Sequence, residues 1–471
     1  MRDRKRVNPG HWNSHNLKGR QIGKDRRIKT IGNQSPHILQ LFVPYCRNIR
    51  GKKSVRVYAP TNQISLFFPE IVWSCVEQDL YHLSSVPKNG NERYNTAIME
   101  YTIAIDIGAG ESTKLALCLS PSEIVVEDEF GVEHYGSSFD AYCRGLSGRI
   151  VDLVARTGMP LQGLRGIGVA TAGILGSDGR FLLISNIPIL QDQNLKTWLE
   201  NRFDVPVGIA NDADAGGLAE WSVLRVELLY WVFGGGWGGS WISRDGVVQY
   251  PATDWSGKDS DLHPTNEPGY SISLSKMMLR EVFLEVGASY ERLECNLLNE
   301  FGGDHTALRG PDGDPESLRA EIILSGPGRR RLFRAVVGDD DFYKRFLDMD
   351  ELNQMADPSR AGKYISKLSS MRVEAAINTD RLYGKILAHA TRGMIKRAVA
   401  DGMSEGVPIC LGGKPSYALP YFGPSTQRFL GKFGLHNYLR PSAVDERGMN
   451  ANVVGAAVLA QNAIAAATGA F

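Results

Sequence analysis

Two aspartates stand where phosphoryl-transfer chemistry would need them. Asp106 and Asp212 each follow a short apolar run, where a strand is expected to end. Ligands of open α/β sheets bind at the carboxyl ends of the strands. A carboxylate there can accept the proton of an attacking hydroxyl or hold Mg²⁺. We therefore predict that Asp212 is a catalytic base and Asp106 a metal ligand; capping of the following helix is the alternative for Asp212.

Three glycine-rich turns follow expected strands and could bind phosphate. Glycine lets the backbone approach a phosphate closely, and its exposed N–H groups can bind the oxygens. The turns match neither the P-loop nor the dinucleotide-binding spacing. An ordinary turn, a tight hairpin and a strand cap are the respective alternatives. The candidate residues are Gly108, Gly110, Thr113 and Lys114 in the first turn, Gly234, Gly235 and Gly236 in the second, and Gly412 and Gly413 in the third.

A further candidate site lies in the sequence Glu267-Pro-Gly-Tyr270, which follows a loop rich in Asp and Ser. A carboxylate and a phenol at this spacing suit a ligand with many hydroxyl groups. By itself the motif also reads as a simple turn.

Apolar runs alternate with helical patterns from residue 99 onward, which predicts an α/β fold. Buried strands are expected at 101–106, 166–171, 228–233 and 407–411. A long helix is expected to end at Gly402, and an alanine-rich helix at 453–467. The segment from about 298 to 378 is polar and is expected to be irregular, with helical patches and an acidic run at 339–341.

Composition excludes several classes of protein. The 471 residues are 43% hydrophobic and 22% charged, which is typical of a globular protein and not of disordered or fibrous chains. The 6 cysteines form no CxxC pair, so zinc ribbons and thioredoxin-like motifs lack support. No secretory signal and no apolar run of about 18 residues are evident. We expect a cytoplasmic protein without membrane association.

Positive charge is concentrated at the N-terminus. Residues 1–98 hold 17 basic and 6 acidic residues, whereas the whole chain has a net charge of +1. A basic segment on an acidic body can bind nucleic acid. However, this segment lacks a helix-turn-helix pattern and the spacing of a zinc finger, which makes nucleic acid an unlikely partner. We expect a disordered extension, or one that is not normally translated, with Met99 as the alternative start.

Taken in order, these motifs resemble the ROK family of sugar kinases, part of the actin-like ATPase and sugar kinase superfamily. Their wording is most similar to the glucokinase and polyphosphate glucokinase branch. The resemblance covers Met99 to about Ala467 and is carried by DIGAGESTK, GIGVATAGILGSDGRFLLISNIP, ANDADAGGLAE, GGGWGGS, NEPGY, LGGKPS and NANVVGAA. It implies that Asp212 is the catalytic base. It also implies sugar contacts for Asn211, Asp212, Glu267, Tyr270, Gly173 and Ser185.

The same resemblance implies a two-lobed actin-like (ribonuclease H-like) fold with a central cleft. The expected lobes are 99–210 with 451–471, and 211–450 with a polar insertion at about 298–378. The implied activity is phosphoryl transfer from ATP or polyphosphate to a hexose hydroxyl, with Mg²⁺, in a homodimer. The chain departs from the family pattern at Tyr270, where His is usual, and at Gly235, where Thr is common. Residues 271–294 contain no Cys, so no structural zinc is expected.

Two other functions remain open at this point. ROK transcriptional regulators share this body, but they carry an N-terminal winged helix, whose pattern is missing here. A sugar-binding protein without catalysis is the second alternative, because the first glycine turn and Tyr270 depart from the kinase pattern.

Overall fold

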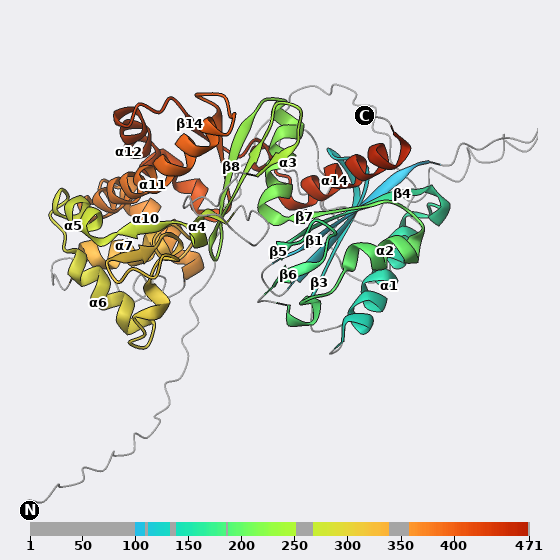
Figure 1. Ribbon diagram of the computed structural model, residues 1–471, viewed down its shortest axis with the longest axis horizontal. Coiled ribbons are helices and arrows are strands. Elements are labelled where there is room, and N and C mark those ends of the chain that lie inside the picture. The colour runs from blue at the N-terminus through green and yellow to red at the C-terminus, as the bar shows by residue number, and fades with distance from the viewer. Residues whose placement is uncertain are drawn as a thin grey trace, which may run out of the picture. The chain divides into compact units, whose positions relative to one another are not determined.

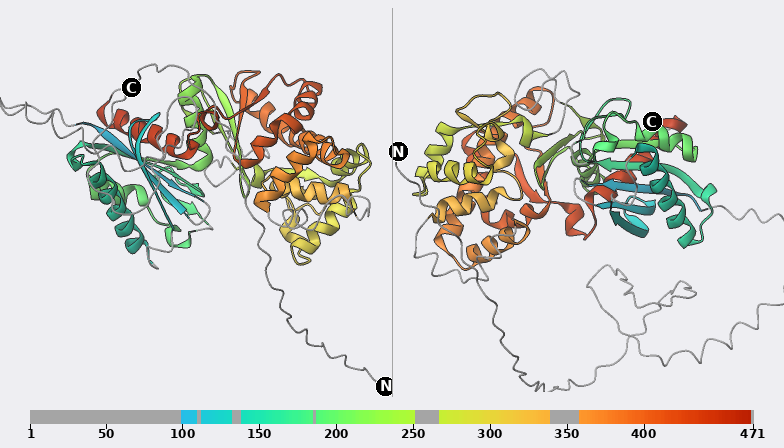
Figure 2. Two further views of the ribbon diagram at one scale, coloured as in Figure 1. Left: turned by 180° about the vertical axis from the view of Figure 1, so that it is seen from behind. Right: turned by 90° about the horizontal axis from the view of Figure 1, so that it is seen from below.

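The computed structural model describes residues 99–108, 112–131, 138–184, 187–250, 267–338 and 358–469. All described residues lie in one unit of the chain, Tyr94–Phe471. The predicted basic extension at 1–98 lies outside the described residues. Figures 1 and 2 show the elements of the unit Tyr94–Phe471.

The first sheet has the strand order β3-β2-β1-β4-β7. The strands β1, β4 and β7 are parallel, and β2 runs antiparallel between β1 and β3. Their carboxyl ends therefore meet at one edge, which carries Asp106 and Asn211. The strands are β1 (Tyr101–Ile107), β2 (Ser112–Ser120), β3 (Glu123–Gly131), β4 (Leu164–Thr171) and β7 (Val207–Asn211).

Alternating side chains give this sheet two different faces. On one face, large residues such as Ile103, Ile105 and Val169 share a core with α1 (Phe139–Thr157) and α2 (Leu195–Phe203). On the other face the residues are small, including Ala104 and Ala170, and they pack against α14 (Ala451–Thr468). Because successive side chains of a strand point to opposite faces, the large residues lie on one face of the sheet and the small residues on the other.

Helix α14 lies unusually close to the first sheet because glycines occupy the sheet positions that face it. A Cβ atom on Gly168 would lie 1.7 Å from the carbonyl oxygen of Ala456, and one on Gly208 would lie 2.4 Å from that of Leu459. Figure 1 shows α14 running along β4 and β7 on the side away from α1 and α2. No other residue type would allow this approach.

The second sheet has the order β10-β9-β8-β13-β14. One face of β8 contributes Leu229, Trp231 and Phe233 to the largest core, which is covered by helices that include α11 and α12. The other face contributes Leu228 and Tyr230, which pack against α3. The strands are β8 (Leu228–Phe233), β9 (Trp237–Ile242), β10 (Val248–Gln249), β13 (Pro408–Gly412) and β14 (Tyr438–Pro441), and the helices are α3 (Asp212–Leu224), α11 (Glu374–Ala400) and α12 (Leu419–Lys432).

Helix α3 is packed between the second sheet and α14. Gly216 faces the ring of Tyr230, and Gly455 of α14 approaches the carbonyl of Ala215 so closely that a Cβ would lie 2.0 Å from it. The buried carboxylate of Glu220 accepts hydrogen bonds from backbone N–H groups of α13 (Ala443–Glu446), at 2.8 Å from Ala443. These contacts hold α3, and with it the residue at its first turn, Asp212.

The segment at about 298–378 is more regular than predicted. Apart from 339–357, which lies outside the described residues, it consists largely of short helices whose apolar faces join the core. These helices are short, and α7 carries the four residues Arg329, Arg330, Arg331 and Arg334, so its apolar pattern is weak in the sequence. The remaining elements of the chain are α4 (Pro268–Ser271), α5 (Lys276–Leu284), α6 (Tyr290–Glu300), α7 (Gly328–Val337), α10 (Pro358–Ser370), α13 (Ala443–Glu446), the two-stranded sheets β5–β6 (Ile174–Leu175, Phe181–Leu183) and β11–β12 (Ser273–Ser275, Ser317–Arg319), and the 3₁₀ turns η3 (Leu161–Gly163), η4 (Pro188–Leu190), η5 (Thr306–Leu308), η6 (Ala320–Ile322) and η7 (Lys414–Ala418).

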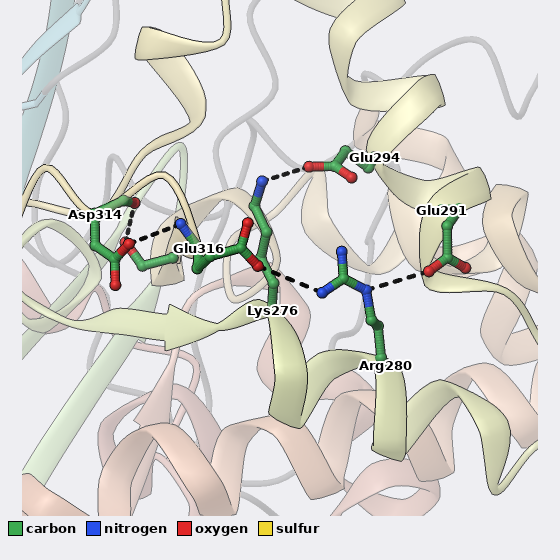
Figure 3. Close-up of polar contacts among 7 residues, drawn as sticks. Lys276, Arg280, Glu291, Glu294, Asp314 and Glu316 are labelled. Carbon is green, nitrogen blue, oxygen red and sulfur yellow. Dashed lines mark hydrogen bonds and ion pairs between the residues drawn. The ribbon is translucent and has the colours of Figure 1, made fainter.

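Ion pairs join α5, α6 and the loop before β12 (Figure 3). Lys276 Nζ lies 2.5 Å from Glu294 Oε1, and Arg280 connects Glu291 at 3.2 Å with Glu316 at 3.4 Å. Exposed pairs of this kind stabilise little individually. These pairs help to position β12. This strand leads directly to Glu321, which lies near the second glycine turn.

The expectation that no segment could span a membrane needs one correction. Among the described residues, α14 alone has the length and hydropathy of a candidate span, and half of it is buried. Its small apolar residues pack against β1, β4, β7 and α3, which accounts for its composition.

We predict that Gly168→Ala lowers the free energy of unfolding by about 1 to 3 kcal/mol or more, because the added methyl group has no space beneath α14. The matched control is Gly148→Ala, on the exposed side of α1 with no atom nearby. That variant should be unchanged or up to about 1 kcal/mol more stable. Urea denaturation of both variants measures the difference, and equal stabilities would contradict the close packing.

Candidate functional site

Asn211 and Asp212 occupy the junction between β7 and α3. Asn211 caps the helix, and its Oδ1 accepts a hydrogen bond from the Ala213 N–H at 2.8 Å. Its Nδ2 donates to the carbonyl oxygen of Gly173 at 3.0 Å and to Glu267 Oε1 at 3.3 Å. Capping is thus done by Asn211, and the half-buried carboxylate of Asp212 accepts backbone hydrogen bonds, including one from the Ala213 N–H at 2.9 Å. Its remaining oxygen lone pairs are available to a ligand.

Glu267 is the N-cap of the short helix α4, and Tyr270 lies within that helix. Glu267 begins the helix and reaches Asn211, so the sequence motifs around these two residues meet in space. Tyr270 is 54% exposed, and its ring lies over the Arg319 guanidinium, 4.9 Å from the ring centroid. The structure therefore brings Glu267 to Asp212. Among the described residues, Tyr270 reaches this group through its backbone N–H, which donates to the Glu267 carbonyl oxygen at 3.1 Å, and not through its side chain.

Asp106 ends β1 opposite Lys114 of β2 in an antiparallel hairpin. Its carboxylate is buried, accepts a hydrogen bond from Asn452 Nδ2 at 3.1 Å and lies 3.8 Å from the Lys114 ammonium. Asn452 belongs to the first turn of α14. Burial raises the pKa of Asp106, and the contacts with Asn452 and Lys114 oppose that effect.

Crowded carboxylates control the electrostatics of this site. Burial raises the pKa of Asp212 to about 7, with further contributions from the negative charges of Asp106 and Asp214. Burial also raises the pKa of Glu267 to about 8, aided by the charge of Asp212. Such shifts concentrate where side chains perform chemistry. Near neutral pH, Asp212 can exchange protons readily.

The second and third glycine turns line one cavity of about 710 Å³. Gly234 and Gly235 form the turn between β8 and β9 and face open space, and Gly413 has a φ of +80° at the start of η7. The turn is shorter than the predicted Gly234–Gly239, because β9 begins at Trp237. Gly236 and Gly412 are adjacent but do not line the cavity. We call this space the donor cavity.

Sequence reasoning missed most of the donor cavity. Its other walls come from Gly326 to Arg329 at the start of α7, from Gly362 to Ser366 of α10, and from Lys414 and Tyr417 of η7. Tyr417 is 67% exposed. A tyrosine three residues beyond Lys414 was visible in the sequence, whereas the α7 and α10 walls lie in the segment predicted to be irregular.

Glu321 and Asn452 were also missed at the acidic site. The charge of Glu321 raises the pKa of Glu267, and Asn452 donates to Asp106 from 346 residues away in the chain. Two predicted residues, Gly110 and Ser185, lie outside the described residues. Gly108 and Thr113 lie on the β1–β2 hairpin; Thr113 is fully buried, and its hydroxyl has no hydrogen-bond partner among the described residues.

The carboxylates of this site fit Mg²⁺ only as part of an open coordination shell. Within the described ranges, no group of three or more acidic, His or Cys side chains forms a protein cage for a metal ion. Magnesium is commonly held by one or two carboxylates together with water and substrate phosphates. Asp106 and Asp212, whose charges raise each other's free energy, suit that mode of binding.

Comparison with known proteins gives one family and one curated relative. Residues 102–245 match the ROK family. The kanosamine kinase of Amycolatopsis mediterranei (strain S699) is 33% identical over 147 residues, which are 30% of this chain and 46% of that relative. The match thus spans less than half the length of the relative.

Solved structures of two ROK proteins share the fold. A ROK family glucokinase from Streptomyces griseus, in complex with glucose and AMPPNP, has a TM-score of 0.51 at 16% identity, covering 77% of this chain and 99% of its own. A ROK family transcriptional regulator, a homologue of the E. coli MLC protein, has a TM-score of 0.51 at 14% identity, covering 78% and 79%. The expected two-lobed actin-like α/β fold is confirmed.

We predict that Asp212→Asn raises the free energy of unfolding at pH 8. The pKa of Asp212 rises from 3.8 to about 7 on folding, so the wild-type protein loses stability as the pH rises through this interval. Asparagine carries no charge, so the variant should be about 1 to 3 kcal/mol more stable at pH 8, and the difference should shrink toward pH 4.

Asp178→Asn is the matched control for this stability measurement. Asp178 is an exposed residue whose pKa is lowered by a hydrogen bond from the Arg180 backbone, so its neutralisation should give no gain. Urea denaturation at pH 5 and pH 8 tests both variants. An Asp212→Asn protein no more stable than wild type at pH 8 would contradict the electrostatic strain.

Proposed function

Because residues 102–245 form a ROK family domain, we propose that the chain transfers a phosphoryl group from a nucleotide to a hexose hydroxyl, in the manner of a glucokinase. The observation that carries this proposal is the acidic site at the start of α3. A carboxylate with a pKa of about 7 lies beside Asn211 and Glu267, whose polar groups suit sugar hydroxyls.

The residues account for the steps of such a transfer. Asp212 accepts the proton of one sugar hydroxyl as its oxygen bonds to the terminal phosphorus and the bond from phosphorus to the donor oxygen breaks. A pKa near the working pH suits a general base. Asn211 and Glu267 would bind other hydroxyls and thereby orient the reacting one. Bound Mg²⁺, held in part by Asp106, would neutralise charge on the donor phosphates.

The donor cavity supports ATP over polyphosphate. Its volume of about 710 Å³ lies within the usual range for a small-molecule site. Gly234 and Gly235 offer backbone close to a phosphate, and the exposed ring of Tyr417 offers a flat surface for a base. A polyphosphate chain has no flat group and would not need this ring.

A transcriptional regulator is the second candidate. The observation that favours it is the similarity of this fold to the ROK regulator. The TM-score with the regulator is the same as the TM-score with the glucokinase, 0.51. The fold by itself therefore does not separate the two functions. The raised pKa of Asp212, the position of its carboxylate and the donor cavity favour the kinase.

We predict that Asp212→Asn lowers kcat for phosphoryl transfer by about 10² to 10⁴-fold, since it removes the general base. The assay pairs ATP or polyphosphate with glucose, mannose, fructose, N-acetylated hexosamines and kanosamine, with Mg²⁺ present. The wild-type rate should rise with pH and level off above about pH 7, where Asp212 is deprotonated.

Asp178→Asn is the control and should keep the wild-type rate. Turnover by Asp212→Asn above a tenth of wild type would refute the base, and no turnover with any pair would favour the regulator.

We predict that Tyr417→Ala raises the KM for ATP about tenfold through lost stacking, while any KM for polyphosphate changes less than about twofold. Tyr438→Ala removes a similarly exposed tyrosine on β14, away from the cavity, and should leave both constants unchanged. An unchanged KM for ATP in Tyr417→Ala would contradict the assignment of the donor cavity.

A further inference from the structure

A second cavity lies beside α11 and α12, outside the site described above. Its volume is about 730 Å³, and it is walled by α11, α12 and the end of α5. Helices α11 and α12 lie side by side, as Figures 1 and 2 show. Of the residues that line the donor cavity, only Tyr421 also lines this one. We call it the basic cavity.

Four cations line the basic cavity in two helical pairs. Arg381 and Lys385 are four residues apart on α11, and Arg428 and Lys432 are four residues apart on α12. Like charges at this spacing face each other on a helix surface and destabilise it. Placing two such pairs around one cavity adds further repulsion, which a bound anion would relieve.

Carboxylates neutralise only part of this charge. Glu285 pairs with Lys385, and Asp380, the other acidic residue of the lining, pairs with the buried Arg329 at 2.6 Å. Across the described ranges, no ion pair joins Arg381, Arg428 or Lys432 to a carboxylate. The cavity therefore keeps an excess of three positive charges.

Lys385 differs from the other three cations of the cavity because its side chain is buried. Its side chain is only 10% exposed and lies 4.9 Å from the centre of the Phe429 ring, whereas that of its partner Glu285 is 59% exposed. A desolvated ammonium needs an anion, and an exposed carboxylate is readily exchanged for another one. Glu285 thus occupies the place that a ligand's anionic group would take.

We propose that the basic cavity binds a small molecule that carries phosphate. Arginine guanidinium groups match phosphate oxygens in a bidentate geometry, and Lys385 would supply a buried point charge. The ligand would be either a polyphosphate chain or a sugar phosphate, which share this chemistry. The inference goes beyond the proposed kinase activity and does not depend on it.

The basic cavity and the donor cavity share a wall. Asp380 lines the basic cavity, and its carboxylate accepts hydrogen bonds from Ser369 and, at 2.7 Å, from Arg329 Nε. Arg329 lines the donor cavity and donates to Gly362 and Ser366 of α10. The wall between the two cavities therefore contains this buried ion pair, through which a ligand in the basic cavity could affect the donor site.

Isothermal titration of the full-length protein with tripolyphosphate and, separately, with glucose 6-phosphate tests the proposal. At least one probe should bind, and Arg381→Gln/Arg428→Gln should weaken that binding about tenfold or more. Glu285→Gln should strengthen it, because the ligand no longer competes for Lys385. Changes of opposite sign in these variants would not result from a general loss of folding, and circular dichroism checks each fold.

Two lysine variants serve as controls. Lys396→Gln removes an exposed cation of α11 outside the cavity, and Lys414→Gln removes a cation of the donor cavity. Each should change the affinity less than about twofold. The proposal fails if neither probe binds, if the double variant binds as wild type does, or if either control weakens binding as much as the double variant. Tighter binding of tripolyphosphate would identify the ligand as a polyphosphate chain, and tighter binding of glucose 6-phosphate would identify it as a sugar phosphate.

Discussion

The close approach of α14 to the first sheet is the constraint on which the rest of the structure depends. Glycines at positions 168 and 208 remove the side chains that would otherwise hold the helix away. The helix then reaches both α3 and the end of β1, where Asn452 contacts Asp106. Since α3 also packs on the second sheet, this single helix determines where Asp212 lies relative to Asp106.

The acidic site places carboxylates together at a cost in stability. Burial raises the pKa values of Asp106, Asp212 and Glu267, and the charges of neighbouring carboxylates add to the effect, so the ligand-free fold bears an unfavourable charge cluster. The rigid surroundings of α3 prevent these side chains from separating. A sugar hydroxyl or a cation would lower the free energy of the same arrangement, which is why strain of this kind is typical of functional sites.

The segment between 298 and 378 contributes to the donor cavity and packs against α11, which lines the basic cavity. Helices α7 and α10 form one wall of the donor cavity, and the buried pair of Arg329 and Asp380 links that wall to α11. Removing one partner of such a pair leaves an uncompensated buried charge. The segment is therefore part of the core around both cavities, and not an appendage to it.

The sequence by itself determined the elements and the chemistry that depend on local pattern. Apolar runs predicted β1, β4, β8 and β13 to within two residues, and the position of Asp212 between a strand and a helix identified the main candidate for catalysis. Strand periodicity and turn composition are local properties, so they can be recognised without the fold. The domain boundaries, the metal-binding role of Asp106 and the sugar contact of Tyr270 stay predictions.

Only the tertiary structure decided which residues meet. Asn452 and Asp106 are 346 positions apart, and the walls of the donor cavity come from four separate segments. The pKa of Asp212 depends on burial and on neighbouring charges that no local pattern reveals. Contacts between distant segments arise when helices and sheets pack, and packing depends on the shapes of whole surfaces. For that reason the catalytic candidate was visible in the sequence, while its electrostatic setting and both cavities were not.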